Sequence, residues 1–236
     1  MTNTSWRTLS QNPVAPEVHR HRWLQTKELC RPIRGRVGDF IQGCVAGRTL
    51  LDIGCAEHDS SHWDRPEWQH AKLKKWAKTL TGIDIIPEAA AALCERGYDV
   101  RCVDATSSCD LGLRFERVMI GDVIEHVSDP VALIRFSLRH LVSDGVILIH
   151  TPNPFYCRNF LRVVREGIFI ENAEHISWMT TGNMMEISER AGATMKSYHP
   201  ITRHRERCSP LYWALRIWSG REPELLARSH YYMLGK

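Results

Sequence analysis

Three aspartates each lie at the end of a short apolar run that has the pattern of a buried strand. Asp52, Asp84 and Asp104 end or directly follow the runs 48–53, 80–85 and 99–103. Since the carboxyl ends of parallel strands meet at one edge of an α/β sheet, and ligands bind there, three acids in this position predict one shared crevice. A single acid of this kind would be interpreted as a cap of the following helix, but three in succession favour a binding site.

The loop after the first run limits which ligand this crevice can take. Gly54 lets the backbone approach a ligand closely, but the second and third glycines of a dinucleotide-binding G-x-G-x-x-G motif are absent. Glu57 and Asp59 would also repel a pyrophosphate. A nucleoside with a positive centre and no phosphate fits better, with its ribose hydroxyls on Asp84 and its adenine amino group near Asp104. S-adenosylmethionine has these properties.

Several motifs together resemble the class I S-adenosylmethionine-dependent methyltransferases, in their small-molecule, ubiquinone-pathway-like and sugar- or lipid-associated branches. They are Leu-Leu-Asp-Ile-Gly-Cys, Gly-Ile-Asp-Ile, Val-Asp-Ala, Gly-Asp-Val-Ile-Glu-His-Val and a run ending in Thr-Pro-Asn-Pro. The resemblance covers about residues 48–154 and implies S-adenosyl-L-methionine as cofactor. The cofactor-binding residues it implies are Asp52, Gly54, Cys55, Ala56, His58, Asp84, Ile85, Asp104, Ala105, Gly121 and Asp122. The family's glycine-rich loop is replaced here by the bulky, charged stretch 56–59.

Two histidines are candidates for the proton transfer that methylation of a hydroxyl requires. His126 follows the predicted strand 117–120 at the mouth of the crevice, and His175 lies on a loop that could close over an acceptor. A general base in this place contributes about 10²–10⁴-fold in rate. The alternative is that Glu125 and His126 only order their loop through hydrogen bonds. His150, inside a predicted strand, is expected to be a core histidine with its hydrogen bonds satisfied.

The pattern D-x-x-E-H, formed by Asp122, Glu125 and His126, offers oxygen and nitrogen ligands of the kind that divalent cations take. It is similar to the metal-binding pattern of ubiquinone-pathway O-methyltransferases, with an aspartate in place of a glutamate. Many proteins with a similar run need no metal, so we expect no metal site here.

These residues require a sheet that brings the ends of its strands together, and strand and helix patterns alternate as such a sheet needs. We predict an α/β fold: a doubly wound, mostly parallel, seven-stranded Rossmann-like sheet with an antiparallel last strand. The domains expected are an N-terminal helical cap over 1–47 and the main domain over 48–236, with an acceptor-side helical insertion over 155–180. The predicted strands are 48–53, 80–85, 99–103, 117–120, 146–151, 194–199 and 231–234. The predicted helices are two within 17–44, one opened by Pro66, and others over 88–96, 131–141, 155–170, 181–191 and 203–228.

Length and composition place further bounds on the chain. Its 236 residues suit one α/β domain, and 43% hydrophobic with 25% charged residues is an ordinary globular composition. No secretory signal is visible at residues 1–11, and the apolar runs are too short to cross a bilayer. The eight cysteines are scattered without a C-x-x-C pair, which indicates reduced thiols and a cytoplasmic protein.

Charge is distributed unevenly along the chain. Residues 1–48 and 196–236 each hold eight Lys/Arg against three Asp/Glu, although the net charge of the whole is +4. Basic ends are ordinary on flanking helices, but they would also frame an anionic acceptor or rest on an anionic surface. We therefore expect a small-molecule acceptor, anionic or carbohydrate-like, that is methylated at oxygen, and an oligomeric state that the sequence leaves open. The alternatives are a nucleic-acid-modifying or nucleic-acid-binding protein, which is disfavoured, and a non-catalytic cofactor-binding module.

Overall fold

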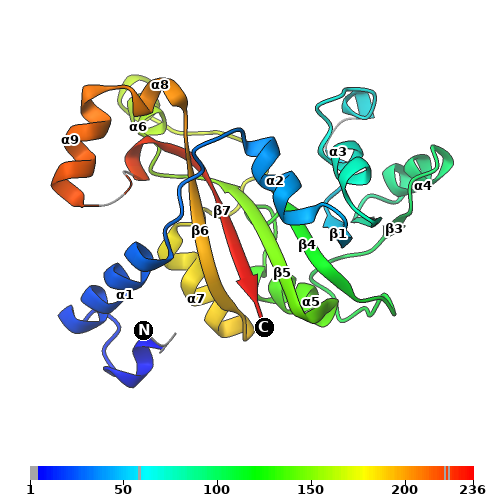
Figure 1. Cartoon of the computed structure of the whole chain (residues 1–236), viewed down its shortest axis with the longest axis horizontal. Coiled ribbons are helices and arrows are strands. Elements are labelled where there is room, and N and C mark those ends of the chain that lie inside the picture. The colour runs from blue at the N-terminus through cyan, green and yellow to red at the C-terminus, as the bar shows by residue number, and fades with distance from the viewer. Residues whose placement is uncertain (1–4, 58–59, 221, 223) are drawn as a thin grey trace.

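Seven strands of the described chain form one sheet in the order β3-β2-β1-β4-β5-β7-β6 (Figure 1). The computed structural model describes residues 5–57, 60–220, 222 and 224–236. The strands are β1 (Thr49–Ile53), β2 (Thr79–Asp84), β3 (Val100–Cys102), β4 (Phe115–Gly121), β5 (Leu141–Pro152), β6 (Thr194–Thr202) and β7 (Ala227–Gly235). β1 to β5 pair in parallel, whereas β7 runs antiparallel between β5 and β6. The predicted fold class and the antiparallel last strand are confirmed.

The central strands carry apolar side chains on both faces, so both faces of the sheet are covered. In β1, Leu51 and Ile53 join one core cluster with β4, β5 and the following helices, and Leu50 joins a second cluster on the opposite face. The alternation is the period of two that any strand imposes on its side chains. Asp52 therefore shares the face of Leu50, although it lies within an otherwise apolar strand.

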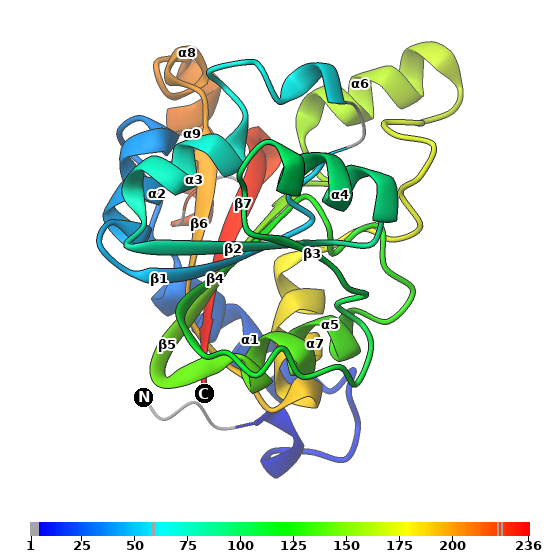
Figure 2. The same cartoon turned by 90° about the vertical axis from the view of Figure 1, so that its right-hand side faces the viewer.

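The helices of the described chain cover these faces, connect the strands or lie at one end of the molecule (Figure 2). They are α1 (Pro16–Leu29), α2 (Val37–Val45), α3 (Gln69–Trp76), α4 (Pro87–Glu95), α5 (Pro130–Arg139), α6 (Cys157–Glu166), α7 (Thr181–Ala191), α8 (His204–Arg207) and α9 (Pro210–Ser219). α5 shows why such helices start where they do, because Asp129 caps it by accepting the Ala132 N–H at 2.9 Å and Pro130 occupies its first turn. α7 likewise begins at a capping threonine, Thr180, and ends at Gly192.

Three predicted boundaries were wrong for local reasons. Pro66 does not open a helix, since α3 begins only at Gln69. β5 starts at Leu141 rather than at 146, and a break in its register with β4 absorbs the turn residues Asp144 and Gly145. The predicted helix 203–228 is divided into α8 and α9, because Ser209 and Pro210 begin a new helix.

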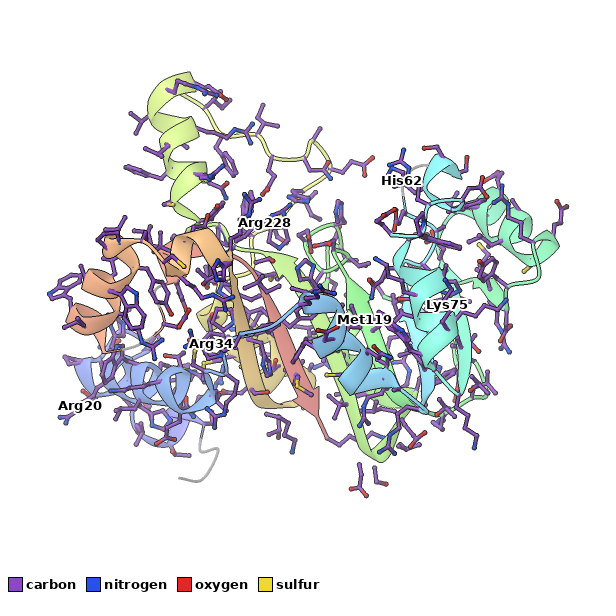
Figure 3. The ribbon with its side chains drawn as sticks, turned by 45° about the horizontal axis from the view of Figure 1, so that its top comes forward. Arg20, Arg34, His62, Lys75, Met119 and Arg228 are labelled. Carbon is purple, nitrogen blue, oxygen red and sulfur yellow. The ribbon has the colours of Figure 1, made fainter. Side chains whose placement is uncertain are left out.

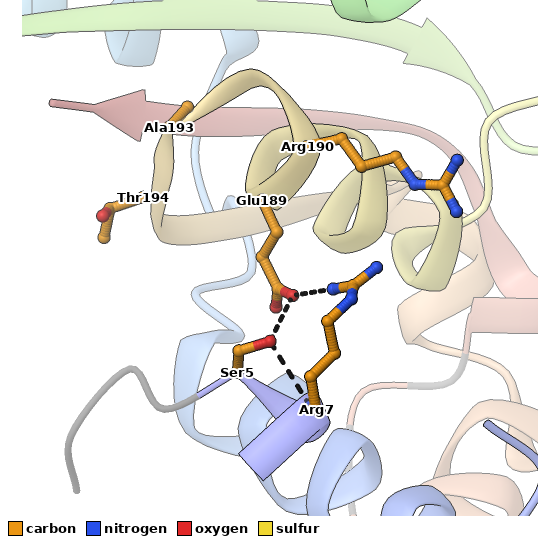
Figure 4. Close-up of a pocket in the computed structure, with 6 residues that line it drawn as sticks. All are labelled: Ser5, Arg7, Glu189, Arg190, Ala193 and Thr194. Atoms are coloured by element: carbon orange, nitrogen blue, oxygen red, sulfur yellow. Dashed lines mark hydrogen bonds and ion pairs between the residues drawn. The ribbon is translucent and has the colours of Figure 1, made fainter. Parts of the chain in front are cut away.

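The N-terminal segment is bound to α7 by a group of ion pairs. Glu189 of α7 faces Arg7 at 3.2 Å and Arg22 of α1 at 2.5 Å, and Glu186 pairs with both arginines as well. Figure 4 shows the surface pocket beside this group, where the Ser5 hydroxyl also donates to Glu189. Since both acids of α7 pair with arginines of this chain, the contacts beside this pocket hold the N-terminal segment against α7.

Candidate active site

A cavity of about 720 Å³ lies at the carboxyl ends of β1, β2 and β4. Eight of the residues singled out in the sequence line it: Asp52, Gly54, Cys55, Asp84, Ile85, Gly121, Asp122 and His126. Figure 3 labels two further lining residues, Met119 on β4 and His62 on the loop after β1. The sheet therefore brings most of the predicted residues together. His58, which was also predicted to bind the cofactor, lies outside the described residues.

Gly54 has a backbone conformation and surroundings that exclude a side chain. Its φ is +77°, and a Cβ placed on it would lie 2.4 Å from Cγ2 of Val123. The Gly54 N–H donates to the Ile83 carbonyl at 2.9 Å, which holds the turn against β2. The glycine thus allows the loops after β1 and β4 to meet at the floor of the cavity.

We expect Gly54→Ala to lower both stability and cofactor affinity. A left-handed conformation costs an alanine about 1–2 kcal/mol, and the contact with Val123 adds to this. The double variant Gly54→Ala/Val123→Ala removes the clash but keeps the strained φ, so it should recover part of the lost stability in thermal unfolding. An equal loss in the single and double variants would show that Val123 is not the obstacle.

Asp84 is buried, with 7% of its surface exposed, and is oriented by the backbone. Its Oδ2 accepts the Ala56 N–H at 2.9 Å and its Oδ1 accepts the Ile86 N–H at 3.2 Å. Each carboxylate oxygen has a second lone pair for a ligand hydroxyl. Ile85 lies beside it in the cavity lining with 66% of its surface exposed, so it offers an apolar face of the kind a purine ring packs on. A fixed acid beside an exposed apolar residue fits a nucleoside. Ala56 contributes through its backbone, since its side chain is buried outside the lining.

Asp104 and Ala105 do not take part in this cavity as the structure describes it. The Asp104 side chain is exposed, and its Oδ1 accepts both the backbone N–H and the hydroxyl of Thr106 at 2.7 Å. Ala105 is packed in the core. β3 ends at Cys102, and although the Val103 N–H still donates to the Asp84 carbonyl at 2.9 Å, Asp104 lies beyond the strand, at the start of the turn that follows. Two of the three predicted acids, Asp52 and Asp84, line the cavity, whereas Asp104 caps its own turn, and its contact with the adenine remains a prediction.

Asp52 lines the cavity but is not a free carboxylate. Its Oδ2 is 2.7 Å from Nδ1 of His70 in α3, and both side chains are almost fully buried. A buried carboxylate needs such a partner because burial without one is costly. Nothing in the spacing of the sequence indicated His70, which lies 18 positions later. Cys55 follows on the same turn, and burial raises the pKa of its thiol far above the ordinary value, so it stays protonated.

Asp122 has a left-handed backbone with φ of +52° and faces His150 at 2.9 Å, Oδ1 to Nδ1. Burial raises the pKa of Asp122, but the hydrogen bond and charge of His150 outweigh it and leave that pKa below its ordinary value. His150 was predicted to be a core histidine, and this was wrong. It lies on the opposite face of β5 from Ile149, near the strand's end, and lines the cavity.

His126 lines the cavity, while His175 lies behind it. The two rings meet edge to face with centroids 4.7 Å apart, and His175 Nε2 is 4.0 Å from Oε1 of the buried Glu125. The other oxygen of Glu125 accepts the Thr151 hydroxyl at 3.1 Å. The Glu125 carbonyl accepts the N–H groups of Ile176 and Ser177 at 3.1 and 3.2 Å, which fixes the segment that carries His175.

These three side chains also have the spacing of a cation site. One ligand atom from each of Glu125, His126 and His175 lies within 4.8 Å of the others. Asp122, the first residue of the D-x-x-E-H pattern, pairs with His150 instead. The expectation of no metal remains a prediction.

The buried Glu125 predicts an unusual dependence of stability on pH. Burial first, and then the charge of Asp122, raises its pKa from 4.5 to about 7. Because the folded state binds this proton more tightly than the unfolded state, stability falls as pH rises from about 4.5 through 7. We expect Glu125→Gln to match the wild type near pH 5 and to exceed it by about 2–3 kcal/mol at pH 8 in urea unfolding.

Glu116 provides the comparison for this measurement. The backbone N–H of Thr49 and the side chain of Arg48 lower the pKa of Glu116 below its ordinary value. Glu116→Gln should therefore be less stable than the wild type at pH 8, which is the opposite sign. If Glu125→Gln also has a lower free energy of unfolding than the wild type at pH 8, the ionised Glu125 is well solvated in the folded protein.

Several lining residues were not among the predicted binding or catalytic residues. Glu57, the second non-glycine residue with positive φ, pairs with His62 at 2.7 Å across the loop after β1. Tyr231 enters from β7, where it is paired with His150. Glu174 lines the outer part of the cavity next to His175. The charged loop 56–59 could have indicated the pair of Glu57 and His62. The contribution of β7 could not be predicted, because it depends on where the last strand lies in the sheet.

Comparison with known proteins agrees with this geometry. The family model described as "Methyltransferase domain" matches residues 20–198. The chain belongs to this family. It is a class I S-adenosylmethionine-dependent methyltransferase, and S-adenosyl-L-methionine is its cofactor.

Relatives of this methyltransferase include named enzymes. It is 25% identical over 214 residues to a ubiquinone biosynthesis O-methyltransferase of Pseudomonas entomophila (strain L48), and 25% identical over 214 residues to one of Pseudomonas paraeruginosa (strain DSM 24068 / PA7). Each match covers 80% of this chain and 87% of the relative. Among solved structures, a methyltransferase from Mesorhizobium loti superposes with a TM-score of 0.51 at 15% identity, covering 82% of this chain and 93% of that one. A methyltransferase from Archaeoglobus fulgidus superposes with a TM-score of 0.52 at 16% identity, and the match covers 91% of this chain and 99% of that one. At such identities these structures support the fold alone.

The methyltransferase has no described helix with both the length and the apolar character that crossing a bilayer requires. All eight cysteines are free thiols.

Proposed function

We propose that this methyltransferase acts on a hydroxyl oxygen of a small-molecule acceptor, anionic or carbohydrate-like, with His126 as the base. The observation that carries the proposal is the series His126, His175 and Glu125, which runs from the cavity lining into the protein. Methylation at oxygen needs a group that takes the hydroxyl proton, whereas a neutral amine can react before it loses one. The relatives are named as O-methyltransferases, which supports the same target atom.

The cofactor supplies an electrophilic methyl group on a sulfonium. His126 takes the proton from the acceptor hydroxyl as the new O–CH₃ bond forms and the S–CH₃ bond breaks. His175 supports the orientation of the His126 ring. Glu125 lies next to His175, so its carboxyl group faces the two histidines when they hold the proton. Asp84 holds the ribose and Gly54 allows the close approach of the methionine part. Positioning of the two reactants supplies most of the acceleration, on the order of 7–11 kcal/mol in well-oriented systems.

We also propose the domain organisation predicted from the sequence. Residues 1–47 form a helical cap, residues 48–236 the methyltransferase domain, and residues 155–180 the insertion on the acceptor side. Contacts of α1 with β6 and of α2 with α3 support a cap that packs along the sheet. A cytoplasmic location remains our expectation.

The proposed function is tested by supplying the enzyme with methyl-labelled S-adenosylmethionine and matched acceptors. Each acceptor is offered as a hydroxyl compound and as its amine analogue: hydroxybenzoates and catechols, free sugars and sugar phosphates. We expect label on the hydroxyl member of a pair and not on the amine. Label on the amine member alone would contradict the role of oxygen.

Two further arms of this experiment address the alternatives. Labelled RNA or DNA, with binding that weakens as salt rises, would favour a nucleic-acid substrate. Turnover that is lost after dialysis against EDTA and restored by Mg²⁺ or Mn²⁺ would place a cation at Glu125, His126 and His175; we expect turnover to be unchanged. A cofactor-binding module without activity would bind S-adenosylhomocysteine but label none of these acceptors.

A further inference from the structure

Helix α9 is built with its apolar side facing outward. Tyr212, which is 1% exposed, and Arg216 turn inward, where the Tyr212 hydroxyl and the Arg216 guanidinium bind the buried Glu222 at 2.9 and 2.8 Å. The outward side chains include Ile217, which is 79% exposed, and Trp218, which is 86% exposed. Leu211 and Trp213 are more than half exposed on the same helix. A surface helix normally has the reverse arrangement.

Helix α6 shows the same feature independently. Its inward residue is the polar Asn159, whose amide donates to the Asn153 carbonyl at 3.2 Å. Phe160, Leu161 and Val164 are 66%, 62% and 68% exposed and form one side of the helix. Beyond α6, Ile168 and Ile170 continue the exposed apolar series. Large exposed apolar patches mark sites of interaction with proteins or membranes.

Both helices lie beyond the same end of the sheet, where β5 and β6 finish. β5 and β6 each run antiparallel to β7, so they point the same way, and α6 follows β5 as α8 and α9 follow β6. Figures 1 and 2 show α6, α8 and α9 at one end of the molecule, and the Tyr156 hydroxyl beside α6 donates to Glu206 of α8 at 2.5 Å. The cavity lies at this same end of the sheet, and the chain after α6 leads through residues 167–173 to Glu174 in the cavity lining.

The surroundings of these apolar faces are basic. Residues 155–170 hold three arginines against one acid, and residues 203–219 hold four arginines against one acid. On α6, Arg158 and Arg162 lie beside the apolar side at helical spacing. An apolar face that includes aromatic residues and is bordered by arginines has the composition of a helix that lies in the interface of an anionic bilayer.

We propose that α6 and α9 together dock this enzyme on the surface of an anionic phospholipid bilayer. Tryptophan favours the boundary between headgroups and acyl chains, and Trp213 and Trp218 place two such rings on α9. A symmetric contact with a second copy would bring two copies of the same basic surface together, and the juxtaposition of like charges is unfavourable. Neither helix is long enough to span, so binding is peripheral. The proposal is independent of which acceptor is methylated.

Co-sedimentation of the full chain with vesicles tests this docking. The vesicles are phosphatidylcholine alone, or phosphatidylcholine in which roughly a quarter of the lipid is the anionic phosphatidylglycerol, so that only the second kind attracts the arginines. The variants are Ile217→Ser/Trp218→Ser in α9 and Phe160→Ser/Val164→Ser in α6. Val14→Ser is the control, since Val14 is 69% exposed and lies outside both helices.

We expect the wild type and the control to sediment with the anionic vesicles, more weakly as salt is raised, and each double variant to bind at least ~10-fold more weakly. S-adenosylhomocysteine binding and thermal unfolding should be unchanged in the variants, because the altered side chains are exposed. Equal binding by wild type and both variants, or no sedimentation with any vesicle, would overturn the proposal. A dimer in vesicle-free buffer that Ile217→Ser/Trp218→Ser dissociates, seen by light scattering, would assign the surface to a second copy instead.

Discussion

His126→Gln is expected to lower kcat by about 10²–10⁴-fold, because a positioned base contributes about that much to proton transfer. The affinity for S-adenosylhomocysteine, measured by calorimetry, should stay within about twofold, since His126 serves the acceptor and not the nucleoside in the proposed arrangement. The wild-type rate should rise with pH in the acid range, as required for a base that must be neutral, and this rise should disappear in the variant. Steady-state kinetics over pH with a labelled acceptor checks both.

His19→Gln is the matched control, since His19 is an exposed histidine on α1. It should leave kcat and its pH dependence unchanged. His175→Gln should lower kcat less than His126→Gln, because His175 acts through the first ring. A kcat that is unaffected by either substitution would show that Glu125 and His126 only order their loop, which was the alternative left open by the sequence.

Asp84→Asn is expected to weaken S-adenosylhomocysteine binding by about 10–100-fold. The amide keeps one oxygen for a backbone N–H but loses the charge, and a hydrogen bond to a charged group contributes about 1.5–3 kcal/mol. Thermal unfolding in the absence of ligand should also show lower stability, because both the Ala56 and the Ile86 N–H groups depend on this carboxylate. Calorimetry on the folded variant separates the two effects.

Asp104→Asn decides between the sequence prediction and the structure. The sequence placed Asp104 at the adenine, whereas in the structure it is exposed and contacts Thr106. We therefore expect its effect on binding to stay within about twofold. An effect as large as that of Asp84→Asn would restore the row of three acids.

The strands that carry Asp52 and Asp84, and with them the position of the cavity, could be predicted from sequence because the signals are local. Asp52 and Asp84 each end an apolar run that is followed by a turn and a helix pattern. Such a pattern can be recognised without knowledge of distant contacts. For Asp104 the same reasoning is less precise, since β3 is only three residues long and its end cannot be located from the pattern. Asp104 follows the end of the strand by two residues and is not part of the described cavity lining.

The pairs that organise the site could not be predicted, because they join elements far apart in sequence. His70 meets Asp52 only when α3 packs on β1 and β2, and His175 meets Glu125 only when the segment before α7 folds back onto the loop after β4. The outward faces of α6 and α9 were hidden for a related reason. Apolar periodicity gives the width of a helix face, but not the direction in which it points.

The position of β7 has a consequence for truncated forms of this sequence. β7, over Ala227–Gly235, lies between β5 and β6 and supplies Tyr231 to the cavity. Removal of residues 227–236 would therefore leave β6 without its neighbour in the sheet and the cavity without Tyr231. Such a truncation takes out the middle of the sheet and does not merely shorten one edge.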